Sequence, residues 1–188
     1  FLTGRNESKL AAVAGESRSK SQGPAEGFPA DLARLESTDQ LIAAIAAQPR
    51  RYEVLVNNAG FGVHGEFSQT NASSEIDLLH VQLAAALKLT KAVLPGMITR
   101  RSGHILNVGS VYCYAPVPLQ SVYSACKAFL LSFSAALRNE LDGTGVSVTV
   151  FCPGITQTEF RPRAGIAERN KNSGMTADAA ARIAYKET

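Results

Sequence analysis

The sequence contains few of the residues that are typical of disulfide-bonded or metal-binding proteins. Its 188 residues include three cysteines, two methionines and no tryptophan. Cys113, Cys126 and Cys152 have neither paired spacing nor the CxxC pattern of a metal or redox site, so no metal site is predicted. An odd number of cysteines in a chain rich in apolar residues is typical of buried thiols in a reducing compartment.

Long apolar runs and a strong charge bias are also missing. No uninterrupted apolar run approaches the roughly 18 residues of a membrane span, and we expect no signal peptide. The net charge of +3, from 19 Lys+Arg against 16 Asp+Glu, is too small to indicate a nucleic-acid surface. We therefore expect a cytoplasmic protein, without membrane or nucleic-acid partners, that forms one domain over residues 1–188.

Short apolar runs typical of buried strands alternate with helical stretches. Strands are expected at 1–4, 28–32, 53–57, 104–108 and 146–151. Helices are expected from Asn6 to Gly15, after a Ser37–Gln40 capping box, at 74–100, at 121–141 and from about Thr176. Pro95 is expected to bend or shorten the end of the helix at 74–100. Residues 17–27 are expected to form a loop. This alternation predicts a Rossmann-like α/β fold, a doubly wound parallel sheet with helices on both faces. Ligands bind such sheets beyond the carboxyl ends of the strands.

A glycine motif follows the strand predicted at 53–57. Residues 60–65 read Gly-Phe-Gly-Val-His-Gly, which matches GxGxxG. The dinucleotide fingerprint requires its last glycine to open a helix, whereas residues 66–71 are polar and turn-like. We interpret residues 60–65 as a flexible turn and not as a pyrophosphate loop.

Tyr123 and Lys127 are four residues apart in a predicted helix, a spacing that places both side chains on one face. A neighbouring ammonium favours the phenolate and makes tyrosine usable as a general acid or base. Ser110 follows the strand at 104–108, where its hydroxyl is able to polarise a substrate oxygen. Each signal alone is also compatible with an ordinary packed tyrosine, an exposed lysine or a turn serine.

Four signals, in combination and order, resemble the short-chain dehydrogenase/reductase family, and the resemblance runs from Phe1 to about Phe160. They are Asn57-Asn58-Ala59-Gly60, Ser110, Tyr123-Ser124-Ala125-Cys126-Lys127 and Pro153-Gly154. The resemblance implies that Tyr123 exchanges the proton, Lys127 lowers the Tyr123 pKa and holds the nicotinamide ribose, and Ser110 orients the substrate oxygen. It also implies cofactor contacts by Asn57, Ala59, Gly60, Pro153, Gly154, Thr156 and Thr158.

The sequence departs from the family pattern at several points. Gln82 stands where the family commonly has an asparagine that holds a relay water; Gln82 either holds that water in a shifted geometry or is only a polar helix residue. Arg5 follows Gly4 where NAD-preferring members have an acidic residue, which favours NADP(H) over NAD(H) because a guanidinium pairs with a 2′-phosphate. Asp31 and Leu32 are expected beside the adenine. The family's first strand and Gly-rich loop belong before residue 1, and its last strand after the final helix.

The resemblance implies an oxidoreductase acting on a small alcohol or carbonyl compound. Residues flanking the catalytic elements are expected to border its substrate pocket, or else to pack ordinary loops: Phe61, Tyr112, Tyr114, Pro116, Leu119 and Phe160. Residues 161–173 lie where the family has a lid. Two other functions remain open, a nucleotide-sensing or scaffold protein without turnover and an inactive truncated fragment. A homodimer or homotetramer is expected, packed through the helices at 74–100 and 121–141.

Overall fold

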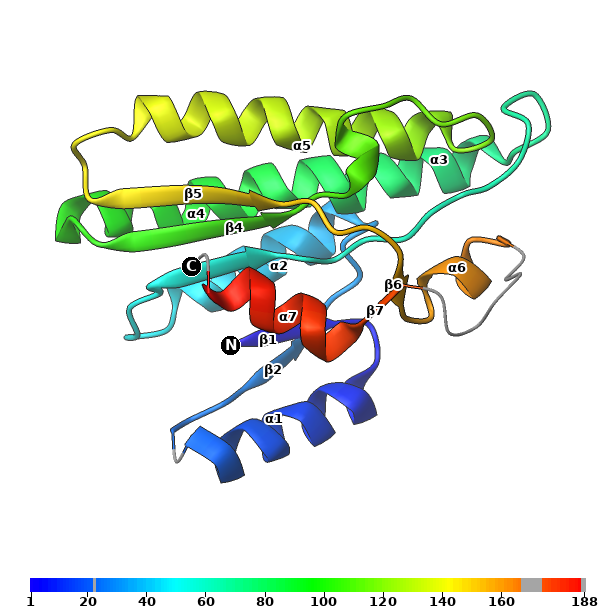
Figure 1. Ribbon diagram of the computed structural model, residues 1–188. Helices are drawn as coiled ribbons and strands as arrows, with labels where there is room; N and C mark the ends of the chain where they lie inside the picture. Colours follow the sequence, from blue (N-terminus) through cyan, green and yellow to red (C-terminus); the bar gives the residue numbers. More distant parts are fainter. Residues whose placement is uncertain (22, 167–173, 187–188) are drawn as a thin grey trace. The chain divides into compact units, whose positions relative to one another are not determined.

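A computed structural model describes residues 1–21, 23–166 and 174–186. The chain divides into two compact units, Phe1–Pro49 and Arg50–Thr188. Each unit contains parallel strands and helices of its own. Figure 1 follows the chain through these elements.

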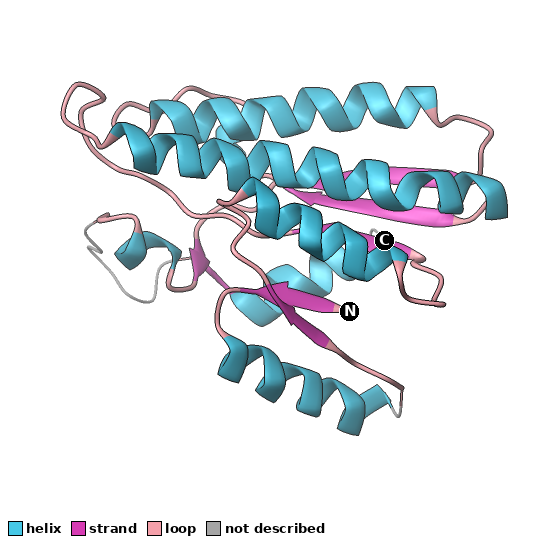
Figure 2. Ribbon diagram, turned by 180° about the vertical axis from the view of Figure 1, so that it is seen from behind, coloured by secondary structure: helices cyan, strands magenta, loops and turns pink. Residues whose placement is uncertain are grey.

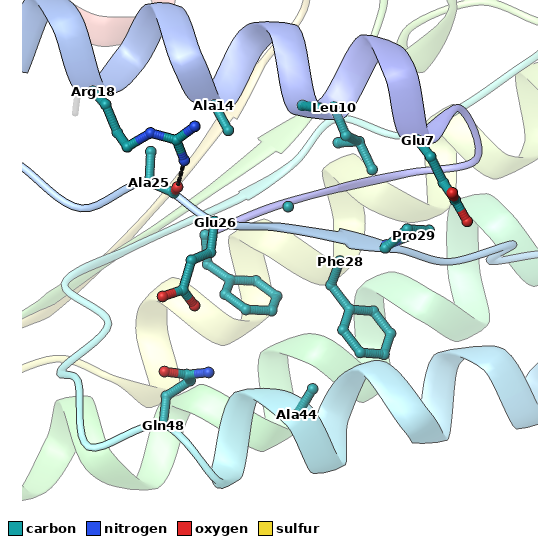
Figure 3. Close-up of a pocket in the computed structure, with 13 residues that line it drawn as sticks. Glu7, Leu10, Ala14, Arg18, Ala25, Glu26, Phe28, Pro29, Ala44 and Gln48 are labelled. Carbon is teal, nitrogen blue, oxygen red and sulfur yellow. Dashed lines mark hydrogen bonds between the residues drawn. The ribbon is translucent and has the colours of Figure 1, made fainter.

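The first unit is built on two short parallel strands, β1 (Leu2–Gly4) and β2 (Gly27–Pro29), with Thr3 opposite Phe28. Helix α1 (Glu7–Ser21) connects the strands, and helix α2 (Leu35–Ala46) follows them. In Figure 3 the two helices lie on opposite sides of β2, with Leu10 and Ala14 on one side and Ala44 on the other. A cavity of about 400 Å³ lies among these elements, and its lining includes none of the side chains predicted for chemistry.

Two sequence predictions for this unit are wrong. Helix α1 begins as predicted, with Asn6 Oδ1 accepting from the Lys9 N–H at 2.9 Å, but it continues to Ser21 through part of the predicted loop. A Lys20–Glu16 ion pair one turn apart supports this extension. The Ser37–Gln40 capping box does not form, because α2 begins earlier, at Leu35, and the Ser37 hydroxyl instead accepts from the Asp31 N–H at 3.0 Å.

The second unit has a three-stranded parallel sheet in the order β3-β4-β5. Its strands are β3 (Val54–Asn57), β4 (Gly103–Val108) and β5 (Val146–Phe151), with Asn57 opposite Asn107 and Val108 opposite Phe151. Strand β4 is central and largely buried. Strand β3 was expected to be covered on both faces, but Val54 and Val56 are 49% and 52% exposed.

Three helical segments lie on one face of this sheet (Figures 1 and 2). They are α3 (Ala72–Leu79), which continues through a π-helical turn, η1 (His80–Ala84), into α4 (Ala85–Arg100), and α5 (Ser121–Glu140). Helix α4 continues past Pro95 to Arg100, so that proline does not shorten it. The stretch Ala72–Arg100 is long and apolar enough to cross a membrane, a property that it shares with core helices of soluble proteins.

A chain of buried polar groups joins the sheet to these helices. The Asn57 amide donates to Asn107 Oδ1 at 2.8 Å and to Thr90 Oγ1 at 3.3 Å. The Asn107 amide donates to Ser134 Oγ at 2.9 Å, and the Ser134 hydroxyl donates to the Leu130 carbonyl at 2.6 Å. Asn107 is fully buried. Because buried polar groups must be hydrogen-bonded, this chain fixes where β3 and β4 end against α4 and α5.

The remaining elements follow β4 and β5 in the chain. They are the 3₁₀ turn η2 (Val111–Cys113), the parallel pair β6 (Thr156–Gln157) and β7 (Met175–Thr176), the short helix α6 (Phe160–Arg163), and α7 (Ala177–Lys186). The expected lid at 161–173 falls partly on residues 167–173, which lie outside the described residues. Its described part begins in α6.

Candidate active site

Tyr123 and Lys127 lie side by side on α5, one helical turn apart, as their spacing predicts. Both are buried, at 7% and 6% exposure. Lys127 Nζ lies 5.5 Å from the centre of the Tyr123 ring and donates to the Val108 carbonyl at 2.8 Å. The lysine therefore links the tyrosine helix to the end of β4.

Ser110 stands just beyond β4 and caps the turn η2. Its hydroxyl oxygen accepts from the Tyr112 N–H at 3.3 Å, and the same side chain lies close enough to the Tyr123 phenol to lower its pKa. The Tyr112 and Phe160 rings flank the Tyr123 ring, at 5.9 Å and 5.2 Å between centres. The serine predicted from its position after a strand is thus in contact with the predicted acid/base.

Burial dominates the electrostatics of Tyr123 and Lys127. It raises the pKa of Tyr123 to about 12, although the nearby Ser110 side chain acts in the opposite direction. It lowers the pKa of Lys127 to about 8, against the opposing influence of the nearby thiols Cys113, Cys126 and Cys152. The pKa of Tyr123 is thus raised where a lowering by Lys127 was expected, because burial is the largest cause and the neighbouring Tyr112, Cys113 and Cys126 act in the same direction.

Gln82 lies in the π-helical turn η1 and is 2% exposed. Its Nε2 donates to the Phe61 carbonyl at 2.9 Å, while its Oε1 is buried without a hydrogen-bond partner among the described residues. A Cβ added at Gly60 would lie 3.5 Å from the Gln82 side-chain carbon Cδ. Gln82 therefore adjoins the loop after β3, and a π-helical turn is a frequent feature of functional sites.

A cavity of about 1280 Å³ opens beside these side chains. It lies along the sheet face of Val54, Val56, Leu106 and Val108, with residues of α7 among its other walls. Because side chains alternate along a strand, this face is opposite to the one that carries Asn57 and Asn107. The predicted site residues that line it are Gly60, Ser110, Tyr123, Lys127, Pro153, Gly154, Thr156 and Thr158, and Asn58 lines it too.

The size and the lining of this cavity fit a nicotinamide dinucleotide. Its volume exceeds the roughly 300–1,000 Å³ typical of pockets for a single small molecule. An added Cβ at Gly154 would meet no described atom within 4 Å, so the backbone there is open to a ligand. The hydroxyls of Thr156, in β6, and of Thr158, just after it, lie in the same segment, where Thr156 donates to the Gly154 carbonyl and Thr158 accepts from the Phe160 N–H, each at 3.2 Å.

Other predicted cofactor residues have different surroundings. Asn57 directs its amide into the polar chain on the helix-covered face, and neither Asn57 nor Ala59 is among the residues lining the cavity. In the first unit Arg5 is exposed just after β1, Asp31 Oδ1 accepts from the Ala33 N–H at 3.1 Å, and Leu32 is buried. The structure gives Asn57 a structural role and leaves the predicted cofactor contacts of Arg5, Asp31 and Leu32 as predictions.

The residues expected around the substrate divide into two groups. Tyr112 and Phe160 line the cavity, and Phe61 packs against the cluster of Leu78, Tyr123 and Cys126. Tyr114, Pro116 and Leu119 are exposed and are not among the lining residues. Residues 60–65 form no helix, which agrees with the interpretation that they are not a pyrophosphate loop, and their predicted role as a flexible turn stays a prediction. The cavity lining also contains Asn58, which was present in the quoted motif but was not predicted as a site residue.

Two cysteines that looked unrelated in sequence lie together. Cys113 and Cys152 have their sulfur atoms 3.5 Å apart. The reason is topological, since Cys113 ends the turn after β4 and Cys152 directly follows β5, and β4 pairs in parallel with β5. Adjacent parallel strands end at the same edge of a sheet, a signal that linear spacing does not contain.

Comparison with known proteins decides the family. The short chain dehydrogenase family matches residues 1–169. The chain belongs to the short-chain dehydrogenase family. Its fold is Rossmann-like, with parallel strands and helices, as the alternating sequence pattern predicts.

Several relatives place this short-chain dehydrogenase chain more closely. It is 36% identical to a ketoacyl reductase, HetN, of a Nostoc species over 72% of this chain and 48% of the relative. It is 37% identical to the NADP-dependent 3-hydroxy acid dehydrogenase YdfG of Salmonella typhi over 69% of this chain and 53% of the relative. The chain thus spans about half the length of these two relatives.

Solved structures show the same likeness. A short-chain dehydrogenase from Sphingobium yanoikuyae in complex with NADPH matches with a TM-score of 0.90 and 32% identity, over 99% of this chain and 74% of that chain. A metagenomic short-chain oxidoreductase in complex with NADP matches with a TM-score of 0.74 and 32% identity, over 82% of this chain and 70% of that chain.

Proposed function

We propose that the protein is an NADP(H)-dependent oxidoreductase that interconverts an alcohol and a carbonyl compound. One observation carries the proposal: Ser110, Tyr123 and Lys127 line a single cavity together with the turn that contains Gly154 and Thr156. An acid/base, a polarising hydroxyl and an ammonium thus face a space that also has an open backbone and hydroxyl donors for a dinucleotide.

The proton transfer is assigned to Tyr123. Because its pKa is raised to about 12, the phenol is protonated at neutral pH and is ready to donate to a carbonyl oxygen. The Ser110 hydroxyl, next to the phenol, turns its single proton to the same substrate oxygen and stabilises the charge that develops on it. When bound, the nicotinamide supplies or accepts the hydride.

Lys127 and Gln82 support this transfer. Lys127 holds its ammonium next to the Tyr123 ring through the Val108 carbonyl, where it stabilises a phenolate after the proton has left. Lys127 also provides a donor for a ribose hydroxyl. We assign the unpartnered Oε1 of Gln82 as the acceptor for a water that returns the proton, in place of the asparagine that the family commonly uses.

The preference for NADP(H) is assigned to Arg5, which follows β1 and is exposed. A guanidinium pairs with a 2′-phosphate in a bidentate geometry that NAD(H) does not offer. The NADP-dependent relative and the NADPH-bound structural neighbour favour the same cofactor. We expect Asp31 and Leu32 to contact the adenine.

The test is a titration of the purified protein with NADPH and NADH, followed by fluorescence, and then a screen of carbonyl compounds for NADPH oxidation. NADPH is expected to bind more tightly than NADH. Arg5→Ala is expected to weaken NADPH binding about tenfold, the equivalent of one charge-assisted hydrogen bond of about 1.5 kcal/mol, without changing NADH binding. Arg138→Ala, which removes an exposed arginine of α5, is the matched control.

The outcomes separate this function from its alternatives. NADPH-dependent reduction of a carbonyl compound, lost in Tyr123→Phe, supports the oxidoreductase. Tight NADPH binding without reduction of any carbonyl overturns it in favour of a nucleotide-sensing or scaffold protein. A protein that binds neither dinucleotide contradicts both functions and fits an inactive fragment.

We also propose a cytoplasmic homodimer or homotetramer. Three free cysteines fit a reducing compartment, and α4 and α5 carry the exposed apolar side chains Ile98 and Phe129. Light scattering after size-exclusion chromatography tests the assembly, and a monomeric mass at micromolar concentration would contradict it.

A further inference from the structure

The side chains of Cys113 and Cys152 form a dithiol at the edge of the proposed catalytic centre. Their sulfur atoms are 3.5 Å apart, and a disulfide needs about 2.05 Å. Both sulfurs lie against Gly109, where an added Cβ would be 2.9 Å from Cys113 Sγ and 3.0 Å from Cys152 Sγ. Because Gly109 has no side chain, the two sulfurs share the space beside it between β4 and η2. A modest movement of the two cysteine side chains would bring the sulfurs to bonding distance.

Cys113 also holds Ser110 in place. Its sulfur accepts from the Ser110 N–H at 3.4 Å, while the Ser110 hydroxyl accepts from the Tyr112 N–H at 3.3 Å. This reciprocal arrangement is a capping box in which a cysteine stands where glutamate or glutamine is usual. Any displacement of the Cys113 sulfur is therefore transmitted to the turn that aims the Ser110 hydroxyl.

We propose that Cys113 and Cys152 are a redox modification site: a hydroperoxide oxidises them to a disulfide, which displaces Ser110 and switches the enzyme off until a dithiol reductant restores it. The proposed inhibition depends on the oxidoreductase function argued above. The formation of the disulfide does not.

The two thiols have unequal access to an oxidant. Cys113 is 7% exposed, whereas Cys152 is half-buried and lies near the exposed Tyr114. Burial raises the pKa of Cys113 to about 11, which keeps it as a thiol at neutral pH. Cys152 is therefore the thiol that the peroxide reaches first, and Cys113 is the resolving thiol.

The chemistry balances in two steps. The Cys152 sulfur attacks a peroxide oxygen, so that an S–O bond forms, the O–O bond breaks and one water leaves, which gives a sulfenic acid. The Cys113 sulfur then attacks the Cys152 sulfur; the S–S bond forms, the S–O bond breaks, and the hydroxyl leaves as a second water with the Cys113 proton. Two thiols are oxidised by two electrons, and one hydrogen peroxide is reduced to two waters.

The experiment oxidises the purified protein with hydrogen peroxide and compares it with Cys152→Ser and Cys126→Ala. Cys126 is a buried cysteine on α5, 1% exposed, so its variant retains the dithiol and is the matched control. Intact mass and peptide mapping are expected to show loss of two hydrogens and a Cys113–Cys152 link in the wild type and in Cys126→Ala. Carbonyl reduction is expected to fall about 100-fold, the loss typical of a missing transition-state donor, and to return with dithiothreitol.

Cys152→Ser is expected to form no intramolecular disulfide and to keep its activity after a peroxide dose that inactivates the wild type. Two results overturn the proposal: a peroxide-treated wild type without the Cys113–Cys152 link, and a linked protein with unchanged reduction rate. A protein that forms the link but reduces no carbonyl even when fully reduced overturns the proposed function and with it the inhibition, while the modification site stands.

Discussion

Replacing Lys127 by methionine is expected to stabilise the protein at neutral pH while it destroys the proposed activity. Lys127 is 6% exposed, and burial lowers its pKa from an ordinary 10.5 to about 8. At 1.36 kcal/mol for each pKa unit, keeping this ammonium protonated costs the folded state about 3 kcal/mol below pH 8. Between pH 8 and 10.5 the unfolded chain binds more protons than the folded one, so this cost disappears as the pH rises.

Methionine removes the cost of the buried charge but also removes the hydrogen bond from Lys127 Nζ to the Val108 carbonyl, which contributes about 1 kcal/mol. The free energy of unfolding of Lys127→Met is therefore expected to exceed that of the wild type by about 2 kcal/mol at pH 7. The difference shrinks above pH 8 and changes sign near pH 10. Burial raises the pKa of the Cys113 and Cys126 thiols to about 11, and Lys127 acts in the opposite direction on both. The pH dependence of the difference is therefore read between pH 7 and 9, where these thiols are protonated in both proteins.

The assay is urea unfolding followed by circular dichroism at a series of pH values, with the denaturant slope m compared between variants. Lys91→Met, the same substitution at an exposed position of α4, is the control and is expected to change stability by less than about 0.5 kcal/mol at every pH. The reasoning is refuted if Lys127→Met is less stable than the wild type at pH 7, or if the difference between the two proteins does not depend on pH.

Two further predictions concern the candidate active site, and a third concerns the buried polar groups that join the sheet to its helices. Tyr123→Phe is expected to lower kcat/KM for carbonyl reduction at least about 100-fold and to leave the dissociation constant for NADPH unchanged; a smaller loss in steady-state kinetics would remove Tyr123 as the acid. Gln82→Leu is expected to change the free energy of unfolding by less than about 1 kcal/mol, because the loss of the hydrogen bond to the Phe61 carbonyl is offset by removal of the buried Oε1, which has no partner among the described residues. The same variant is expected to slow carbonyl reduction, and Gln82→Asn is expected to rescue the rate in part. An unaffected rate would make Gln82 a structural residue only. Ser134→Ala is expected to cost about 1–3 kcal/mol in urea unfolding, since it leaves the buried Asn107 amide without its acceptor, whereas the exposed Ser132→Ala on the same helix is expected to be neutral.

The features that local sequence determines were predictable. Strands β4 and β5 and helix α5 occupy nearly the residues expected from their apolar patterns, because each is long and periodic. The contact between Tyr123 and Lys127 follows from helix geometry alone, and the position of Ser110 follows from the rule that parallel strands present ligand groups at their carboxyl ends.

The features that depend on tertiary packing were not predictable in the same way. The Ser37 hydroxyl had the sequence of a helix cap but is used by the Asp31 N–H, a contact between a strand exit and a helix. Asn57 had the position of a ligand residue, yet its amide is taken by Asn107, 50 residues away. The extension of α1 to Ser21 overrides a composition rich in serine, glycine and charge.

The electrostatic state of the site is the clearest case of such dependence. Sequence places an ammonium one turn from a phenol, and Coulomb attraction alone predicts a lowered tyrosine pKa. The structure adds that Tyr123 is buried among Tyr112, Phe160 and the α3 side chain Leu78, and that the Lys127 ammonium is directed to the Val108 carbonyl. Desolvation of both groups then favours their neutral forms, so the phenol keeps its proton and the lysine loses its own more readily. An acid that holds its proton until a carbonyl oxygen accepts it, beside a lysine whose charge is costly to maintain, is suited to the proton donation that the proposed carbonyl reduction requires.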